Sequence, residues 1–500
     1  MFGLVLGLSV LILLLIYVSG RYNENYWNKR KVKFYHRNKV TGIFWDYLTK
    51  DRAFFEYLYE IYKEYQSEPA IGLGGLLTPT LYVMDPTNVQ HVLASDFHSF
   101  NHRGITISEG DLLANNILLM NGNRWKLVRQ NLTPLFTSTK LRAMYYIIDK
   151  SAIDFMELLK STPELLKGNL FDTLSSFCSA AIGAAVFGVG TQSIFDSPFL
   201  AMARNSFEPN TINNIKFSLA SISTTVCKYL DVKFFTKHEK FFIGAIKQII
   251  EERKKENVKK HDFADICVTL QKNGKLIDKE SGLELEPTDE LLAAQAFFFY
   301  FAGVEPTATA IFATLVELGR HPEFLEKVQN EIDEAFIKND SKMNYDIVSN
   351  MSFLDMAFNE AMRMHPPIAF LTRECVRDTV LPIGNIKVDK GTRIYTPIFE
   401  YHHNEKHFED PETFKPERFS PENIHKIADI SFMPFGKGNR ICVGMRYANL
   451  QAKTGLIYLL RKFTVNTIIK AGGMRYSKQQ LQVRLNNVDL ELSPRTPRCQ

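Results

Sequence analysis

The chain has few cysteines and few tryptophans: six Cys and three Trp among 500 residues. The cysteines are scattered and form no CxxC pair; they are Cys178, Cys227, Cys267, Cys375, Cys442 and Cys499. This spacing excludes a dense disulfide framework and a cysteine-rich zinc site. It also favours a reducing compartment for the folded part of the chain.

A strong excess of charge of one sign is also absent. The net charge is +5, and no basic run interleaves with aromatic residues. Nucleic-acid-binding domains usually carry a clustered basic stretch, so we expect no nucleic acid partner. Internal repeats and Gly/Ser- or Pro-rich linkers are missing too. The sequence therefore predicts one large catalytic domain over residues 45–500.

One long hydrophobic run is present, at the N-terminus. Residues Phe2 to Val18 are almost all apolar, and basic residues follow from Arg21 to Lys33. About 20 apolar residues span a bilayer, so residues 1–20 are predicted to form a membrane signal-anchor helix. The basic stretch 21–44 is predicted to be a linker, and its charge places the remaining chain in the cytosol. A cleaved signal peptide ending near Gly20 remains the alternative.

The rest of the sequence is predominantly helical by period and length, with a small β part. Expected helices are 88–94, 122–135, 140–160, 170–187, 237–257, 264–271, 289–319, 322–338 and 353–364. Expected strands are 80–86, 379–382, 385–388, 393–397 and 481–492, and residues 274–278 are expected to be a solvent loop. The predicted fold class is mainly α with a small β part.

The most informative stretch is Phe435 to Gly444, in which one cysteine lies among glycines just before an apolar helix. Glycines let the backbone approach a flat cofactor closely. A loop that ends at a helix N-terminus favours negative charge, so Cys442 should be held as a thiolate. An isolated thiolate suits axial ligation of haem iron. The alternative is a buried free cysteine that behaves as a small apolar side chain.

This stretch resembles the haem-binding loop of cytochromes P450 at every constrained position. The resemblance implies the cytochrome P450 fold and haem b as cofactor. Cys442 would be the metal ligand, with Phe435, Gly436 and Arg440 in the cofactor-binding loop. The continuation from Gly444 to Ala448 is most similar to insect members of the microsomal, drug- and toxin-oxidising branch.

Glu360 and Arg363 lie three residues apart and can pair on one helix face. Alone, such a pair usually marks a solvated face. His365-Pro366-Pro367 then ends the helix, and Arg418 follows in Pro416-Glu417-Arg418-Phe419. The resemblance implies that Glu360, Arg363 and Arg418 form a buried structural lock that fixes the segment carrying Cys442.

Haem carries two propionates, which need cationic partners when they are shielded from water. The resemblance assigns this role to Trp125 and Arg129 on one helical face, to Arg373 and to Arg440. Arg103 is a further candidate by position.

The helix through residues 297–307 resembles the helix that crosses the oxygen-binding side of the haem. Ala302 and Gly303 are expected to leave room for dioxygen. Glu305 matches the acidic residue of the family pattern, but Pro306 stands where the family has threonine. Pro306 removes the N–H that would bond the Ala302 carbonyl. We therefore expect Glu305, Pro306 and Thr307 to form an altered proton relay within a continuing helix.

The resemblance implies monooxygenation of a lipophilic small molecule with O2. Electrons would come from NADPH through a cytochrome reductase, with cytochrome b5 as a second donor, at the endoplasmic reticulum membrane. Substrate contacts are expected at 105–117, 199–215, 298–304 and 368–371. A reductase dock is expected at Arg124, Lys126, Lys140, Arg142, Lys437 and Arg446. The alternatives are a reductase-independent isomerase or dehydratase, and a haem-binding protein without catalysis.

Overall fold

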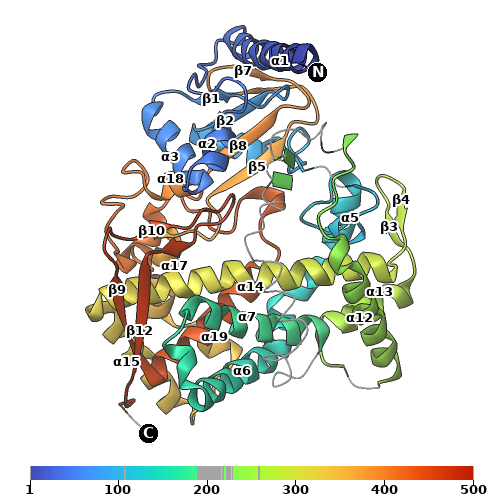
Figure 1. Cartoon of the computed structure of the whole chain (residues 1–500). Coiled ribbons are helices and arrows are strands. Elements are labelled where there is room, and N and C mark those ends of the chain that lie inside the picture. The colour runs from blue at the N-terminus through green and yellow to red at the C-terminus, as the bar shows by residue number, and fades with distance from the viewer. Residues whose placement is uncertain are drawn as a thin grey trace.

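The computed structural model describes residues 2–105, 108–188, 229–256 and 259–498, with a few further positions between 215 and 227. Helices form the body of the molecule, and the sheet that contains β1, β2, β5 and β8 lies at one end of it (Figure 1). The helices are α1 (Phe2–Asn28), α2 (Phe44–Thr49), α3 (Phe54–Glu64), α4 (Pro86–Gln90), α5 (Gly122–Leu132), α6 (Ser138–Ser161), α7 (Leu170–Phe187), α12 (Thr236–Lys255), α13 (Phe263–Asn273), α14 (Asp289–Arg320), α15 (Pro322–Lys338), α16 (Tyr345–Ser349), α17 (Ser352–Met364), α18 (Phe399–His402) and α19 (Met445–Lys462).

The long helix α14 organises the helical body. In Figure 1 it runs across the molecule in yellow, with α7, α6 and α19 on one side of it. The Thr288 hydroxyl accepts from the Leu291 N–H at its start, and Asp289 and Glu290 complement the dipole there. The helix continues through Pro306 to Arg320, as the sequence predicts. Its buried side chains, with those of α7 and α19, make up the larger hydrophobic core.

A four-stranded sheet forms the second core, in the order β1-β2-β8-β5. Strands β1 (Ala70–Leu73) and β2 (Thr80–Val83) are antiparallel, β2 and β8 (Arg393–Pro397) are parallel, and β5 (Phe370–Glu374) is antiparallel to β8. Four two-stranded ladders complete the β structure. They are β12 (Val488–Pro494) with β9 (Phe463–Ile469), β10 (Arg475–Tyr476) with β11 (Leu485–Asn486), β3 (Leu276–Asp278) with β4 (Leu283–Leu285), and β6 (Thr379–Leu381) with β7 (Ile386–Val388).

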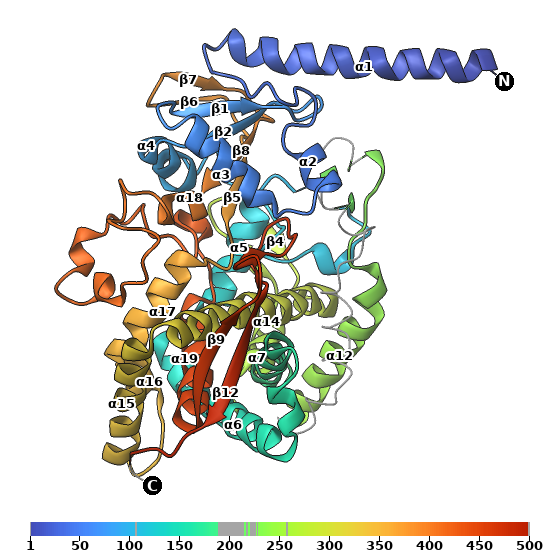
Figure 2. The same cartoon turned by 60° about the vertical axis from the view of Figure 1, so that its left-hand side comes forward.

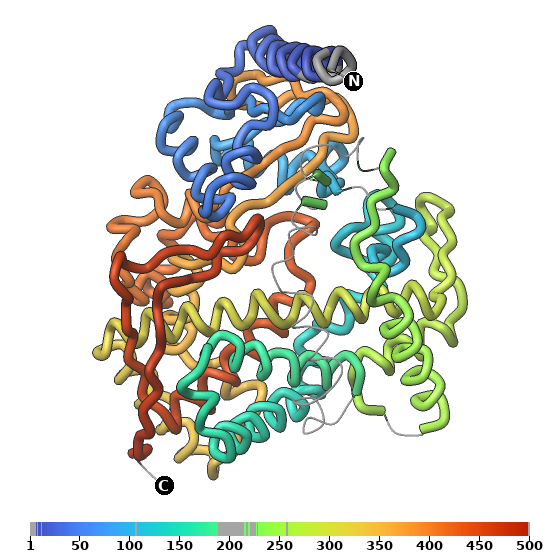
Figure 3. The backbone as a smooth tube through the Cα atoms, viewed as in Figure 1, coloured from blue at the N-terminus to red at the C-terminus, as the bar shows by residue number. Residues whose placement is uncertain are grey.

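The first helix differs from the predicted boundary. It runs to Asn28 rather than ending near residue 20, and it extends past the body of the protein in Figure 2. Its apolar side chains between Val10 and Val18 are mostly exposed, whereas Trp27 is fully buried. Two further helices, α7 and α14, are long and apolar enough to cross a membrane, but 89% and 72% of the relevant windows are buried in the fold. The termini lie at opposite ends of the molecule (Figure 3).

Residues 21–44, expected to be a basic linker, contact the rest of the fold. The Tyr26 hydroxyl donates to Asp389 at 2.8 Å, and Phe34 forms a parallel bridge with Gly72. The backbone of Lys33 accepts from the Gly72 N–H at 2.8 Å. The aromatic residues among the basic ones are buried on the sheet, so this stretch belongs to the folded domain.

The structure also differs from the predicted local elements in two places and confirms one of them. Residues 274–278 contain β3 of a hairpin rather than only a loop. Strands β1, β5 and β9 were not predicted at all, because each is short or mixed in polarity. The predicted helix over 170–187 is confirmed: the Asn169 side chain caps it, and Gly188 in the left-handed region ends it.

The carboxyl group of Glu400 on α18 is buried next to the four-stranded sheet, which makes the stability of this region depend on pH. Both of its carboxyl oxygens are buried beside the Tyr82 hydroxyl, with no well-formed hydrogen bond among the described residues. Burial raises the pKa of Glu400 from 4.5 to about 8. Between these values the unfolded chain loses a proton that the folded chain keeps, so stability falls as pH rises and levels off above pH 8.

We predict that Glu400→Gln flattens this dependence. The variant should melt close to the native protein near pH 4.5 and at a higher temperature at pH 8, measured by thermal unfolding. An equal loss of melting temperature in both proteins across this range would show that Glu400 ionises normally.

Candidate functional site

The Cys442 loop is shaped by glycines and backbone hydrogen bonds. The Cys442 N–H donates to the Phe435 carbonyl at 2.9 Å, and Gly436 and Gly438 have φ of 81° and 70°. A Cβ on Gly438 would lie 2.1 Å from the Leu93 carbonyl oxygen, so no larger residue fits there. Helix α19 begins at Met445, just after the loop.

The Cys442 side chain is solvent accessible, although it lies deep within the protein. Burial raises the pKa of its thiol, and the Gly444 N–H and the charges of Arg129 and Arg103 oppose this effect only in part. Without a bound metal, this balance acts against the thiolate that the sequence predicts. A metal ion bound to the sulfur would supply the missing stabilisation, because coordination deprotonates a thiol.

Four arginines gather around this loop: Arg103, Arg129, Arg373 and Arg440. Their hydrogen bonds go mainly to backbone carbonyls. Arg103 donates to the carbonyl of Arg440 at 3.2 Å, and Arg129 donates to that of Ile441 at 2.9 Å. Arg440 donates to the carbonyls of Asn101 and Met120, at 2.6 and 2.9 Å. The loop around Arg103, helix α5, strand β5 and the Cys442 loop thus bring the guanidinium groups together.

The arginine cluster carries uncompensated positive charge. None of its members forms an ion pair with a carboxylate among the described residues. Burial and mutual repulsion lower the pKa of Arg440 to about 8, of Arg373 to about 9 and of Arg103 to about 10. Arg440 Nη1, Arg373 Nε and Arg103 Nε are buried without a partner in the described chain. Such a cluster fits a ligand that supplies carboxylates.

Trp125 contributes differently from the expectation. Its ring lies under the Arg440 guanidinium, 4.1 Å from the ring centroid, and packs against Phe97. This cation–π contact orients Arg440 toward the cluster. Arg103, only a further candidate by sequence, is as central to the cluster as the four residues named first. Arg373 lies on β5, a strand whose existence the sequence did not reveal.

The structure joins Glu360, Arg363 and Arg418. Arg363 Nε donates to Glu360 Oε2 at 2.8 Å, and Arg418 Nε donates to Glu360 Oε1 at 3.2 Å. Glu360 and Arg363 are completely buried. The Lys415 N–H also donates to Glu360, so one carboxylate connects α17 to the segment that leads to the Cys442 loop.

His402 extends this connection and was missed from the sequence. Its Nε2 accepts from the Met433 N–H at 3.1 Å, which leaves Nδ1 to donate to the Arg363 carbonyl at 3.0 Å. Burial and the charge of Arg363 hold the pKa of His402 well below its usual value. The neutral imidazole therefore bridges the Glu360–Arg363 pair and the start of the loop. No sequence motif marked this histidine.

On α14, Ala302 is exposed between largely buried neighbours, consistent with an open face at this point. Gly303, the next residue, is partly exposed and also packs against α7. A Cβ on Gly303 would lie 2.7 Å from Ile182 of α7, so glycine is needed for the close crossing of these helices.

Glu305 and Thr307 are buried and flank Pro306. Burial raises the pKa of Glu305, while a hydrogen bond from Gln482 and the charge of Arg484 act against this. A carboxyl group with a raised pKa can exchange a proton closer to neutral pH. The structure thus places Glu305 toward the segment between β10 and β11.

The segments expected to contact substrate are only partly described. Residues 199–214 lie outside the described residues. The Gln295 side chain on α14 holds the loop before α5 by accepting from the Ile117 N–H at 2.9 Å and donating to the Asn115 carbonyl at 2.8 Å.

Half of the six basic residues of the expected dock are already paired. Lys126 pairs with Glu280, Arg142 with Asp346, and Lys437 with Asp429. The other three, Arg124, Lys140 and Arg446, are exposed and make no ion pair within the described part of the chain.

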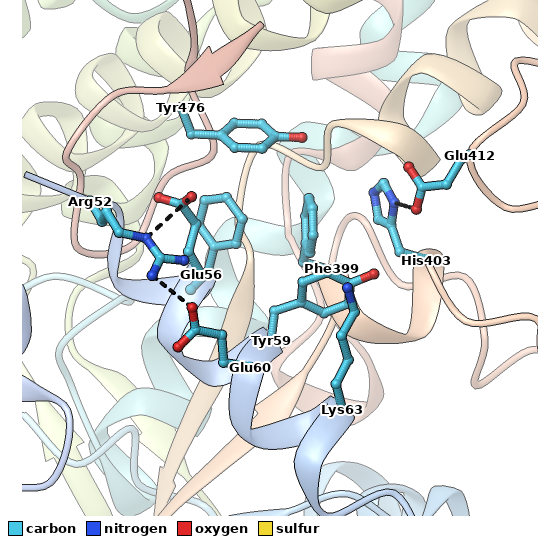
Figure 4. A pocket seen from close by; sticks show the side chains of 10 residues that line it. Arg52, Glu56, Tyr59, Glu60, Lys63, Phe399, His403, Glu412 and Tyr476 are labelled. Carbon is cyan, nitrogen blue, oxygen red and sulfur yellow. Dashed lines mark hydrogen bonds and ion pairs between the residues drawn. The ribbon is translucent and has the colours of Figure 1, made fainter. Parts of the chain in front are cut away.

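A separate pocket of about 360 Å³ lies between α3, α18 and β10 (Figure 4). Its aromatic walls include Phe399 and Tyr476, and charged residues line its rim. Arg52 binds Glu60 at 2.7 Å, and His403 pairs with Glu412 at 3.0 Å. Because these charges satisfy one another, the pocket does not show the unbalanced charge of the arginine cluster.

Comparison with known proteins defines the class. The Cytochrome P450 family model matches residues 37–487, and the chain belongs to this family. It is a cytochrome P450 monooxygenase with a haem-iron cofactor, and the predicted fold class is confirmed.

Similar curated proteins come from insects, as the sequence resemblance indicated. "Probable cytochrome P450 6d4" of Drosophila melanogaster is 28% identical over 517 residues, covering all of both chains. "Cytochrome P450 6B7" of Helicoverpa armigera is 29% identical over 477 residues, covering 92% of this chain and 91% of the relative. "Cytochrome P450 9e2" of Blattella germanica is 28% identical over 488 residues, with the same two coverages.

The residues present fit haem. The accessible Cys442 sulfur offers one axial ligand, and the arginine cluster offers cations for two propionates. No group of three or more metal-ligating side chains occurs among the described residues. When bound, a thiolate-ligated haem supplies the activation of dioxygen.

We predict that Arg373→Met weakens haem binding roughly tenfold, as expected for one lost charge-assisted hydrogen bond. In the described part of the chain, the hydrogen bond that Arg373 donates goes to the adjacent Thr372 carbonyl, so the fold should lose little. Haem transfer to a scavenger protein measures the effect. If the variant retains haem as well as the native protein does, Arg373 does not contribute to haem binding.

Proposed function

We propose that this chain is a haem b monooxygenase that inserts one oxygen atom of O2 into a lipophilic small molecule. Cys442 is the axial ligand, and Arg103, Arg129, Arg373 and Arg440, with Trp125 behind them, hold the propionates. The observation that carries this proposal is the buried arginine cluster without carboxylates beside an accessible cysteine. Phe435 and Gly436 shape the loop beneath the porphyrin.

Electrons come from NADPH through a cytochrome reductase, with cytochrome b5 as a second donor. The exposed, unpaired cations Arg124, Lys140 and Arg446 support this proposal. They lie on α5, α6 and α19, near the cysteine side of the site. Complementary charge on an acidic partner would speed its association with this surface. Lys126, Arg142 and Lys437 contribute less because acids already neutralise them.

The proposed location is the endoplasmic reticulum membrane. The exposed apolar side chains of α1 between Val10 and Val18 support a membrane anchor. The docking of the end of α1 on the sheet would hold the catalytic domain next to the bilayer on the cytosolic side.

The substrate class is proposed to be toxins of plant or synthetic origin, or an endogenous lipid or hormone. The insect relatives support a role in the metabolism of foreign compounds. The apolar residues of the loop before α5 and of 368–371 suit a lipophilic ligand.

Cys442→Ser tests the proposed function. The native protein, reduced and exposed to carbon monoxide, should show the spectrum of thiolate-ligated haem, and the variant should not. Product formation from a panel of lipophilic compounds should require NADPH and reductase. A thiolate spectrum in the variant would exclude Cys442 as ligand. Turnover without NADPH would instead indicate an isomerase or dehydratase, and haem without turnover a binding protein.

We propose that Glu305 moves protons inward and that Pro306 opens the Ala302 carbonyl for a hydrogen-bonded water, with Thr307 as the nearest hydroxyl. Pro306→Thr restores a hydroxyl and an N–H. The variant should form more product per NADPH and release less hydrogen peroxide, whereas Thr307→Val should do the reverse. Unchanged coupling in both variants would contradict the relay.

A further inference from the structure

Three helices cross closely behind the site, and one buried side chain connects them. Gly303 of α14 lies against Ile182 of α7, and Gly455 of α19 lies against Phe177 of α7. An added Cβ would lie 2.7 and 2.5 Å from these neighbours, so both crossings require glycine. Gln451 of α19 is completely buried at this junction.

The Gln451 amide spans the junction. Its Nε2 donates to the Cys178 carbonyl of α7 at 3.2 Å and to the Gly303 carbonyl of α14 at 3.3 Å. Two carbonyl acceptors fix the orientation of the amide, because its own oxygen would repel them. An amide has two hydrogens for this task, whereas a carboxylate has none.

The contact to Gly303 occurs at the weakest turn of α14. Pro306 removes the donor for the adjacent Ala302 carbonyl. A side chain that binds a carbonyl in such a turn determines how the helix deforms. Since α19 begins directly after the Cys442 loop, Gln451 joins that loop to the turn that carries Ala302, Gly303 and Glu305.

We propose that Gln451 is a positioning residue that sets the α14 turn at Gly303 relative to the Cys442 loop. This inference rests on the proposed haem site. Gln451 alone would then fix the position of the α14 turn relative to the Cys442 loop, on the two sides of that site. Gln451 touches neither the arginine cluster nor Cys442 through any hydrogen bond in the described chain.

Gln329 provides a matched control. Its buried amide also donates to two carbonyls, those of Leu460 and Phe463, at 3.4 and 3.1 Å. These contacts lie at the far end of α19 from Cys442. Gln329→Met and Gln451→Met therefore remove the same number of hydrogen bonds and should lower the melting temperature similarly.

The experiment compares both variants as full-length holoproteins by hydrogen exchange. Gln451→Met should speed amide exchange roughly fivefold in peptides spanning 298–310, and Gln329→Met should leave those peptides unchanged. Only Gln451→Met should raise the share of thiol-ligated haem in the reduced carbon monoxide spectrum. Identical exchange and spectra for the two variants would overturn the proposal.

Gln451→Glu tests whether the hydrogen bonds of this side chain, rather than its size, position the α14 turn. A protonated glutamic acid can donate one hydrogen bond to the carbonyls, and a carboxylate cannot. The variant should resemble the native protein at mildly acidic pH and Gln451→Met at mildly alkaline pH. If the ratio of its exchange rate to that of the native protein at the same pH does not change with pH, the result counts against the proposal. If the native protein itself lacks a thiolate spectrum, the haem proposal fails. The exchange data still test whether Gln451 positions the α14 turn.

Discussion

Four clustered guanidinium groups, which no carboxylate pairs with in the described part of the chain, are the constraint on which the site depends. Burial lowers the pKa of all four arginines, and repulsion within the cluster lowers it further for Arg103, Arg373 and Arg440. Three of their nitrogens lack partners in the described chain. Burying like charges is costly unless an anion joins them. The cluster therefore makes sense only as half of an ionic assembly. A dicarboxylate cofactor would complete it, with Cys442 as the neighbouring ligand.

The scaffold holds this assembly from two sides. On the cysteine side, Glu360 binds Arg363 and Arg418, and His402 passes the connection to the loop at Met433. On the oxygen side, α14 keeps its course through Pro306 while Gly303 allows α7 to approach. Burial raises the pKa of the Cys442 thiol, and a bound metal would favour the thiolate. Binding of the cofactor and ionisation of Cys442 are therefore coupled.

Local spacing in the sequence predicted much of this. The Cys442 loop, the Glu360–Arg363 pair and the helices over 170–187 and 289–319 depend on neighbours along the chain. Contacts between distant segments could not be predicted. Strand β5, which carries Arg373, is defined by its partner β8. The role of His402 depends on Met433, and Gly303 needs its size because of Ile182. Aromatic residues bury the stretch that its charge marked as a linker.

The central claim is that the propionates complete the arginine cluster. Comparing the binding of haem and of haem dimethyl ester to the haem-free chain tests it directly, because esterification removes both carboxylate charges and leaves the iron and the ring unchanged. We expect the ester to bind at least roughly tenfold more weakly, from the loss of charge-assisted hydrogen bonds. Equal affinities for the two compounds would contradict the account.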